Sequence, residues 1–399
     1  MDDDGLRLLL GKEGWALLES LPEYDDDAAL GLATKLRERG LDPRLVAAAM
    51  TQSRLRSRAQ AKFGQFARMM LFTSAGLEQA TRLAVAARHA QRYAAAGAKR
   101  VADLGCGIGG DAMALAGLGL DVLAVERDEA TAACATVNLG HLPTARVVHA
   151  DAREIDLAAE GIDAIYADPA RRNAAGRRVF DVASYEPPLA ELLAMRERVP
   201  ALGVKVAPGI PHRDLPEQAH AQWVSVDGHV VEAGLWFAGL APEGPGRSAL
   251  VIRPGGAATA TAAGDPRRDP ERAPHGPLAA YLYEPDGALI RAGLVNQVCE
   301  AVGGVLVDPS IAYVTAPRLV ATPYATTYRV VDRLPFGLKR LRSYLRERGV
   351  GRVAIKKRGT AVSPESLRRQ LDLRGPAEST LVLTRVGGAQ TVLVVEPSA

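Results

Sequence analysis

The chain has 399 residues, 48% hydrophobic and 24% charged, the composition of a soluble globular protein with room for two or three domains. No run of about 18 uncharged apolar residues suggests a membrane span, and the acidic start MDDDG lacks the features of a secretory signal. Three scattered cysteines are too few for a disulfide framework or a zinc site, so we expect a cytoplasmic protein without a bound metal.

Positive charge gathers in two stretches, although the formal net charge is only +3. Residues 53–68 contain five basic residues and no acidic one. Between residues 333 and 374, three acids stand against thirteen basic residues: Arg333, Lys339, Arg340, Arg342, Arg346, Arg348, Arg352, Lys356, Lys357, Arg358, Arg368, Arg369 and Arg374. Clusters of this kind favour a polyanionic partner, the alternative being two solvated helix faces.

The first 95 residues are predicted to form an N-terminal helical region, because apolar residues recur every three or four positions from residue 6 onward. From there, residues 96–254 alternate short apolar runs with helical stretches of about a dozen residues, which predicts a mostly parallel α/β sheet. The predicted strands are KRVADLG, DVLAVERD, ARVVHAD, GIDAIYADP and ALGVKVAPG. Two further runs, HVVEAGLWFAGL and RSALVIRPGG, are joined by APEGPG and predict a terminal antiparallel hairpin.

The C-terminal third is expected to be a separate α+β region. Residues 255–277 are rich in Gly, Pro, Ala and charge, and we expect a flexible linker there. Residues 278–399 then resume a folded pattern, which ends in a strand, a helix, and two strands. Ser363 and Pro364 are the expected cap and first residue of that helix.

A glycine-rich loop follows the first predicted strand in VADLGCGIGGDAM. Gly105, Gly107 and Gly110 satisfy G-x-G-x-x-G, and Glu126 ends the next strand, where it could bind ribose hydroxyls. This pattern suits both dinucleotides and S-adenosylmethionine. The nearby carboxylate of Asp103 would repel a pyrophosphate and attract an ammonium group, which favours S-adenosylmethionine.

Other acids extend this argument. Asp111 follows the glycines at the start of the helix, where it too would disfavour a phosphate. Asp151 ends the third strand, where it could accept from an adenine amino group, and Asp168 ends the fourth, beside the crevice in which such sheets bind ligands.

These motifs, DLGCGIGGD, AVERD, HADA and DPAR, make residues 97–254 similar to the class I S-adenosylmethionine-dependent methyltransferases. The resemblance implies a Rossmann-like fold with S-adenosylmethionine as cofactor. It assigns the methionine pocket to Asp103, Gly105, Gly107 and Gly109, with Asp111 beside them. It also assigns Glu126 to the ribose, and Asp151 with Ala152 to the adenine.

The residues after the fourth strand read Asp168-Pro169-Ala170-Arg171-Arg172. Enzymes that methylate amino groups of nucleic acids carry an acid or Asn, two prolines and an aromatic residue here; the second proline and the aromatic are absent, which weakens that assignment. A similar Asp-Pro-x-Arg occurs in enzymes that methylate carbon 5 of uridine, but the cysteine they need is absent from VKVAPGIPH. Asp168, Pro169 and Arg171 remain the catalytic candidates, with Arg171 able to bind a phosphate or a base.

The basic tail, from about residue 331 to 399, resembles the THUMP-like domain found behind methyltransferases, and AKFGQFARMMLFTSAGLEQAT is similar to the helical part of the same bacterial family. The resemblance implies methylation of a base in RNA, with tRNA ahead of rRNA. RNA would bind the basic C-terminal region, with residues 53–68 as a second candidate. The alternatives are a methyltransferase for a small molecule or a protein, a non-catalytic RNA-binding protein that keeps the pocket, and an NAD-dependent oxidoreductase.

Overall fold

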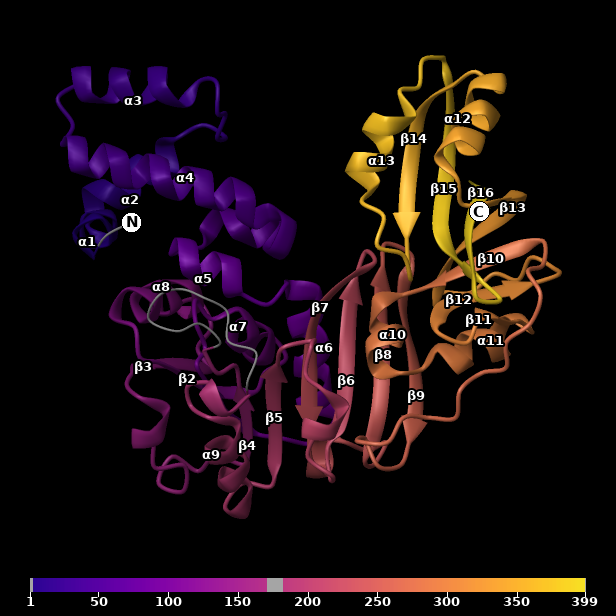
Figure 1. Cartoon of the computed structure of the whole chain (residues 1–399). Helices are drawn as coiled ribbons and strands as arrows, with labels where there is room; N and C mark the ends of the chain where they lie inside the picture. The colour runs from indigo at the N-terminus through magenta and orange to yellow at the C-terminus, as the bar shows by residue number, and fades with distance from the viewer. Residues whose placement is uncertain (1–2, 171–181, 399) are drawn as a thin grey trace. The chain divides into compact units, whose positions relative to one another are not determined.

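The structure, a computed structural model, describes residues 3–170 and 182–398 (Figure 1). The chain forms two compact units. The first contains Met1–Ala207 and Leu235–Pro242, and the second contains Pro208–Gly234 and Glu243–Ala399. The N-terminal helical region and the glycine loop therefore belong to one unit.

Residues 3–95 are mainly helical, as predicted. The helices are α1 (Asp3–Leu10), α2 (Lys12–Ser20), α3 (Ala29–Glu38), α4 (Pro43–Phe63), the 3-10 helix η1 (Gly64–Met69), α5 (Ser74–Gln79) and α6 (Leu83–Ala95). Phe63 and Tyr93 from these helices share one buried cluster with Val101, Ile108 and Tyr166 of the α/β part. Their apolar faces are thus covered by the sheet region and its first loop.

A sheet with the strand order β3-β2-β1-β4-β5-β7-β6-β8-β9 follows. Its strands are β1 (Arg100–Leu104), β2 (Asp121–Glu126), β3 (Ala145–His149), β4 (Ala164–Ala167), β5 (Ala201–Val206), β6 (His220–Val226), β7 (His229–Trp236), β8 (Gly246–Arg253) and β9 (Gly256–Ala263). The first five pair in parallel, which confirms the predicted strands. Between them lie α7 (Gly110–Gly117), α8 (Glu129–Leu139), η2 (Ala152–Glu154), η3 (Val182–Ser184), α9 (Leu189–Ala194) and η4 (Met195–Glu197).

The predicted hairpin between residues 229–240 and 247–256 is wrong. β6, which is missing from the predicted strands, lies between β7 and β8 and pairs with β8 in parallel. β6 and β7 are joined by Asp227 and Gly228, both with positive φ (51° and 79°), the conformation that a two-residue hairpin turn requires. Antiparallel pairing does end the sheet, but between β8 and β9.

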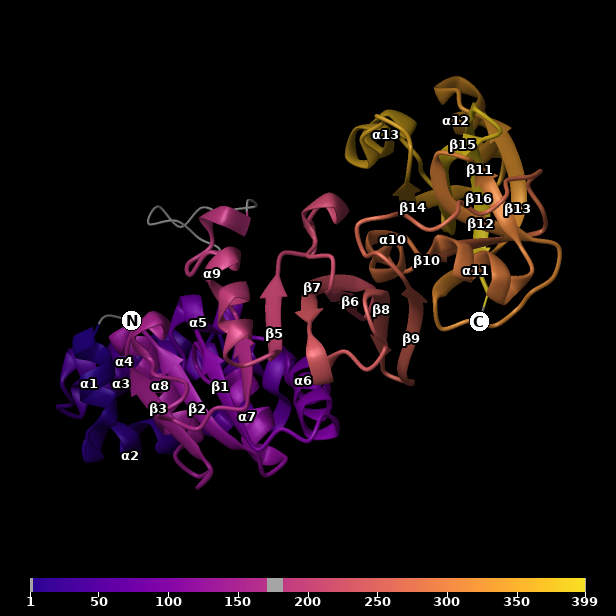
Figure 2. The ribbon, with the colours of Figure 1, turned by 90° about the horizontal axis from the view of Figure 1, so that it is seen from below.

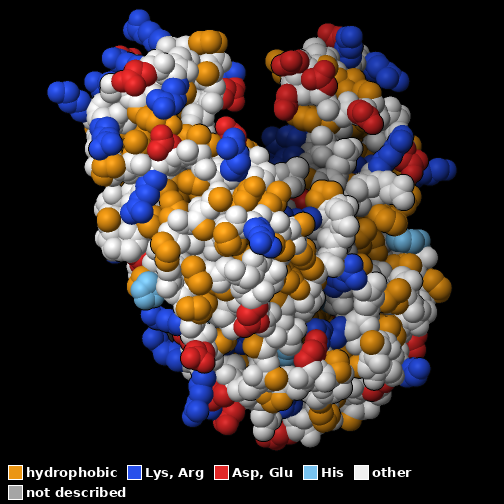
Figure 3. Space-filling view, turned by 90° about the vertical axis from the view of Figure 1, so that its right-hand side faces the viewer, with side chains coloured by type: hydrophobic (Ala, Val, Ile, Leu, Met, Phe, Trp, Pro, Cys, Tyr) orange, Lys and Arg blue, Asp and Glu red, His pale blue; other side chains and the backbone are white. Residues whose placement is uncertain are grey.

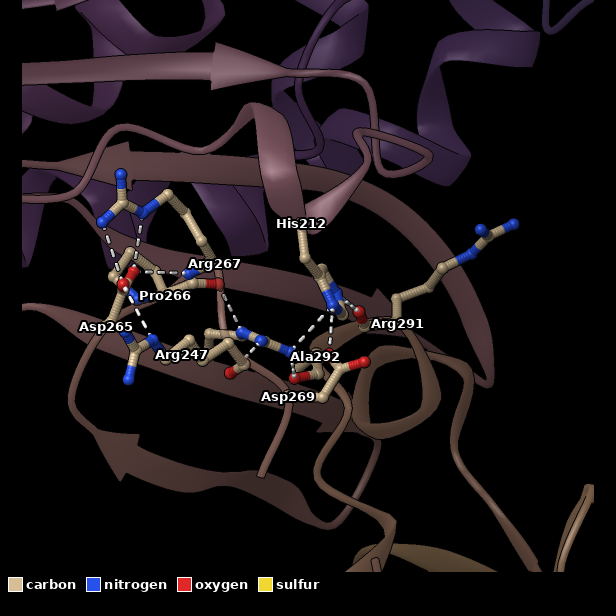
Figure 4. Close-up of polar contacts among 9 residues, drawn as sticks. His212, Arg247, Asp265, Pro266, Arg267, Asp269, Arg291 and Ala292 are labelled. Atoms are coloured by element: carbon tan, nitrogen blue, oxygen red, sulfur yellow. Dashed lines mark hydrogen bonds and ion pairs between the residues drawn. The ribbon is translucent and has the colours of Figure 1, made fainter. Parts of the chain in front are cut away.

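The expected flexible linker at 255–277 is also wrong for much of its length. Residues 256–263 form β9, whose alternating Ala and Thr side chains suit a strand paired on β8. The segment after it is fixed by Arg247, which is 2% exposed. Arg247 donates to the carbonyl of Pro266 at 2.7 Å, to Ala292 at 3.0 Å and to Asp269 at 2.9 Å (Figure 4). A buried guanidinium with several acceptors orders a segment whose composition alone predicts mobility.

A second sheet contains the remaining strands in the order β11-β12-β10-β13-β16-β15-β14, drawn from orange to yellow in Figures 1 and 2. Residues 278–330 thus share one sheet with the THUMP-like part. The elements are β10 (Tyr281–Pro285), α10 (Gly287–Ala292), α11 (Val295–Val302), β11 (Val305–Asp308), β12 (Ile311–Ala316), β13 (Ala325–Pro335), α12 (Leu338–Glu347), β14 (Val350–Lys357), α13 (Pro364–Leu371), β15 (Ala377–Val386) and β16 (Ala389–Pro397). Ser363 caps α13 as predicted, since its hydroxyl accepts from the amide of Ser366.

Candidate active site

The glycine loop joins β1 to α7 and has three left-handed glycines. Gly105, Gly107 and Gly109 have φ values of +81°, +58° and +87°, which L side chains rarely adopt. A β-carbon at Gly105 would lie 2.8 Å from the backbone oxygen of Asp168, whereas one at Gly107 would meet no atom within 4 Å. The first glycine therefore allows close packing of two loops, and the second leaves open space for a ligand.

Glu126, at the end of β2, is tied to this loop. One carboxylate oxygen accepts the amide of Gly107 at 3.0 Å, and the other accepts the amide of Asp128 at 2.9 Å. Each oxygen keeps a lone pair that a ligand hydroxyl could use. The side chain therefore shapes the loop, and its contact with a ribose stays a prediction.

Asp103 is the most deeply buried acid of the site, at 1% exposure. Neither carboxylate oxygen makes a hydrogen bond of standard geometry with a described residue. Burial raises the pKa of Asp103 well above its ordinary value, and the negative charges of Asp111 and Asp168 raise it further. No residue within 3–170 or 182–398 forms an ion pair with this buried carboxyl group.

Asp111 lies within the first turn of α7 and is also buried. It is 2.8 Å from Nδ1 of His89 on α6, and the rings of Tyr166 and Trp236 lie 5.3 Å from that imidazole. Burial opposes the charged form of Asp111, but its hydrogen bond to His89 and the charges of His89 and Lys205 outweigh this and lower its pKa. Asp111 thus has a charged or ionisable side-chain partner among the described residues, whereas Asp103 has none there.

Asp168 and Pro169 follow β4 directly. Oδ2 of Asp168 accepts from Nζ of Lys205 at 2.7 Å, and the same ammonium donates to the hydroxyl of Thr81 at 3.0 Å. Lys205 comes from β5 and is 3% exposed. Arg171, the third catalytic candidate, lies outside the described residues.

Asp151 ends the β3 segment and caps η2, because its carboxylate accepts the amide of Arg153 at 2.9 Å. Ala152 is the first residue of η2 and is half-buried. Arg153 also pairs with Glu191 at 3.1 Å. A capping role does not conflict with adenine binding, since a carboxylate oxygen can accept more than one hydrogen bond; the predicted adenine contact stays a prediction.

Three contributors to this cluster come from outside the sequence motifs: Thr81, His89 and Lys205. Thr81 and His89 belong to the N-terminal helical region, for which the sequence alone could not decide between a cofactor cap and an RNA contact. Of the three, only Lys205 could have been noticed in the sequence, because it is a lysine within the fifth apolar strand. The acids at the ends of β1, β2 and β4 lie close enough for Glu126 and Asp168 to raise the pKa of Asp103, and their roles stay predictions.

The described residues fit a cofactor that carries positive charge. Asp103 is a buried acid that no cation of the described ranges pairs with, and Asp111, Asp168 and Glu126 are close enough to raise its pKa. An ammonium or sulfonium group would relieve this repulsion, whereas a phosphate would add to it. The open space at Gly107 lies beside Glu126, so a cofactor can approach the loop backbone there.

The described residues meet the requirements of neither a metal site nor a membrane-spanning helix. Within residues 3–170 and 182–398, no group of three His, Cys, Asp or Glu side chains is arranged to hold a metal ion. Over the same ranges, no helix combines the length and apolarity needed to cross a membrane.

Comparisons with known proteins agree with this geometry. Family models match residues 102–170 as a methyltransferase domain, residues 325–397 as a THUMP domain-like region, and residues 2–59 as a domain of unknown function, DUF8688. The first match covers the glycine loop and the start of the DPARR motif. The second covers most of the predicted THUMP-like part.

Similar proteins extend the likeness over most of the chain. Uncharacterized S-adenosylmethionine-dependent methyltransferases from two strains of Mycobacterium tuberculosis, H37Rv and CDC 1551, are each 34% identical over 362 residues, which covers 86% of this chain and 95% of theirs. A crystal structure from Porphyromonas gingivalis W83, provisionally assigned as a methyltransferase, matches with a TM-score of 0.73 and 20% identity. That match covers 95% of this chain and 100% of the other, and it shows a shared fold.

Proposed function

Because the chain belongs to the S-adenosylmethionine-dependent methyltransferases, we propose that it transfers the methyl group of this cofactor to a base in RNA, with tRNA as the first candidate. The observation that carries the RNA substrate is the THUMP-like match at residues 325–397. Domains of the THUMP class are associated with tRNA modification, and the basic excess in this region supports the same assignment.

The basic C-terminal region has two kinds of cation. Several arginines and lysines are used internally; Lys356, for example, pairs with Glu284 at 2.6 Å, and Arg346 donates to the carbonyl of Asp372 at 3.1 Å. Six others are exposed and form no side-chain hydrogen bond or ion pair with a described residue: Arg333, Lys339, Arg340, Lys357, Arg369 and Arg374. These six are the candidates for phosphate contacts.

An exposed aromatic residue lies among them in sequence. Phe336 is 38% exposed and lies two residues before α12, the helix that carries Lys339 and Arg340. A phenyl ring near cations suits an RNA strand, because bases stack on the ring while phosphates pair with the cations. On the face drawn in Figure 3, Lys and Arg side chains alternate with Asp, Glu and hydrophobic ones, which favours contacts at separate points over one continuous basic surface.

The second basic stretch, residues 53–68, supports RNA binding more weakly. Arg56 donates to the carbonyl of Met70 at 2.9 Å and stacks over Trp15, and burial lowers its pKa to about 10. Lys62 also donates to backbone carbonyls within the helical region. Only Arg54, Arg58 and Arg68 remain as exposed cations there.

The proposed chemistry needs no residue beyond those in the site. Bound S-adenosylmethionine supplies an activated methyl group on a sulfonium. Asp103 would hold the ammonium end and Glu126 the ribose, which fixes the direction of in-line attack. Asp168 and the carbonyl of Pro169 would orient the acceptor, and Asp168 would take its proton where it has one.

A covalent cysteine step has no support in the site. All three cysteines are buried. Burial raises the pKa of Cys106, which lies in the glycine loop, well above its usual value, so that its thiolate is disfavoured.

Mass spectrometry of nucleosides from wild-type and deletion strains tests the proposal. We expect one methylated nucleoside to disappear from the RNA of the deletion strain and to return when the gene is restored. A gene carrying D168A should fail to restore it. If every RNA nucleoside is unchanged and labelled methyl enters protein or small molecules instead, the RNA substrate is wrong.

A further inference from the structure

The ammonium of Lys205 connects three segments that are far apart in the sequence. Its Nζ lies 2.7 Å from Oδ2 of Asp168 and 3.0 Å from Oγ1 of Thr81. The side chain of Lys205 is almost fully buried, and Thr81 is 5% exposed. Since a buried ammonium requires partners that are held in place, Thr81 helps to fix the position of Lys205, and Lys205 that of Asp168.

Thr81 is itself held by a second lysine. It follows α5, and Nζ of Lys62 on α4 donates to the carbonyls of Leu77, Glu78 and Ala80 at 2.8, 2.7 and 2.8 Å. These carbonyls belong to the last turn and the end of α5, where helical oxygens lack partners in the helix. Lys62 thereby fixes the turn from which Thr81 reaches the sheet.

Thr81 also lies against the cofactor loop. Its backbone oxygen is 3.6 Å from the position of a β-carbon on Gly110, the first residue of α7. One residue thus contacts both the glycine loop and the group that holds Asp168. The N-terminal helical region reaches the centre of the site through this contact.

We propose that Lys205 and Thr81 are positioning residues for methyl transfer, and that Lys62 supports them by fixing the turn before Thr81. Lys205 engages Oδ2 of Asp168 and leaves Oδ1, to which no described residue donates, for the methyl acceptor. The inference rests on the proposed function to the extent that Asp168 faces the acceptor. It makes the N-terminal helices part of the catalytic apparatus.

The test uses the purified full chain, tritiated S-adenosylmethionine and an unfractionated lysate of the source organism lacking the gene as methyl acceptor. T81V keeps the shape of the side chain and removes the hydroxyl, T81S keeps the hydroxyl, and K205M removes the ammonium. T34V is the matched control, because Thr34 is exposed and its hydroxyl bonds only within its own helix. The affinity for S-adenosylhomocysteine is measured in parallel by calorimetry.

We expect T81V and K205M to lower the limiting rate by roughly 10- to 100-fold, the scale of a misplaced catalytic group. The lysate concentration at half-maximal rate should stay within about twofold of wild type. The affinity for S-adenosylhomocysteine should fall far less than the rate, because Thr81 and Lys205 act on the cofactor side only through Asp111 and neither is assigned a direct cofactor contact. T81S should restore most of the rate, and T34V should match wild type.

Three results would overturn the inference: an unchanged rate in T81V, a T81S variant as slow as T81V, or a cofactor affinity that falls in parallel with the rate. The T81V and T81S pair decides the matter even if K205M does not fold. Partition of label between RNA and protein tests the substrate separately. Label found only in protein would reject the RNA proposal, while the ratio of rates among variants would still test the positioning role.

Discussion

The backbone oxygen of Asp168 occupies the space that a side chain on residue 105 would need. A β-carbon at Gly105 would lie 2.8 Å from that oxygen, closer than real β-carbons approach. The glycine loop and the segment that carries Asp168 therefore pack against each other at Gly105. This contact sets the distance between the glycine loop, which is proposed to bind the cofactor, and Asp168, which is proposed to face the methyl acceptor.

G105A is expected to impair both cofactor binding and the placement of Asp168. The new methyl group must displace the Asp168 backbone, in addition to the cost of about 1–2 kcal/mol for a positive φ in an L residue. G97A is the matched control, since Gly97 has a φ of +78° and no atom within 4 Å of its β-position. We expect both variants to lose stability in chemical denaturation but only G105A to lose S-adenosylhomocysteine binding. Equal binding by the two variants would mean that the contact is unimportant.

D103N is expected to weaken cofactor binding and remove its dependence on pH. Burial and nearby acids raise the pKa of Asp103, so the free protein favours the protonated carboxyl, whereas a bound ammonium favours the carboxylate. Binding should therefore release a proton, and affinity should rise with pH through this pKa. Loss of a charge-assisted contact of about 1.5–3 kcal/mol corresponds to at least tenfold in Kd. Calorimetry in two buffers of different ionisation enthalpy measures the released proton.

The same variant should be more stable than wild type without cofactor. A raised folded-state pKa of an acid stabilises the fold below the unfolded pKa, and this contribution is lost as pH rises through the folded value. An asparagine carries no such pH dependence. Chemical denaturation of both proteins at pH 5 and pH 8 should show that the difference in their free energies of unfolding is larger at the higher pH. A wild type that is more stable at both pH values would contradict this.

Removal of the exposed side chains at the start of α12 should weaken RNA binding. F336A removes a stacking surface that contributes about 1–3 kcal/mol per base. K339A with R340A should reduce the slope of log affinity against log salt by about 0.7 for each phosphate that is no longer neutralised. R352A is the control, because Arg352 is exposed but paired with Glu378. Titration of labelled bulk tRNA at several salt concentrations measures both effects, and an R352A loss as large as that of the double variant would count against a specific surface.

Replacement of Arg247 by methionine should destabilise the second unit. Three carbonyls and Asp269 lose their buried donor, and a buried carbonyl left without a hydrogen-bond partner costs about 1–3 kcal/mol. Hydrogen exchange of residues 264–269 should become faster. Arg267 provides the control, because R267M removes only exposed ion pairs with Asp265 and Glu217. If R247M and R267M have the same free energy of unfolding, Arg247 does not organise this segment.

Local sequence patterns predicted those parts of the fold that depend on short-range order. The five parallel strands and the glycine turn were readable from apolar runs ending in Gly or Asp, and Glu126 lies at the loop as expected. The Asp227-Gly228 pair also carried a hairpin signal, but the less apolar run before it, AQWVSV, hid β6. The pairing of β6 with β8 has no local signature at all.

The polar centre of the site was harder to predict. Thr81 lies 124 residues from Lys205, and nothing in either local pattern indicates that the two meet. The same holds for His89 and Asp111, whose contact depends on how α6 packs against α7. The linker prediction failed because one buried residue, Arg247, binds a segment whose own composition favours mobility.

The path of the chain between the two units has a consequence for how they can be studied. The chain leaves the first unit after Ala207, returns for Leu235–Pro242, and leaves again, so it passes between them three times. A single cut or truncation at residue 254 does not separate the units, because residues 1–254 hold the whole first unit together with parts of the second. The returning segment contains Trp236, whose ring lies 5.3 Å from His89. Any shortened chain that omits the C-terminal half must therefore still carry this short segment to retain the wall around His89 and Asp111.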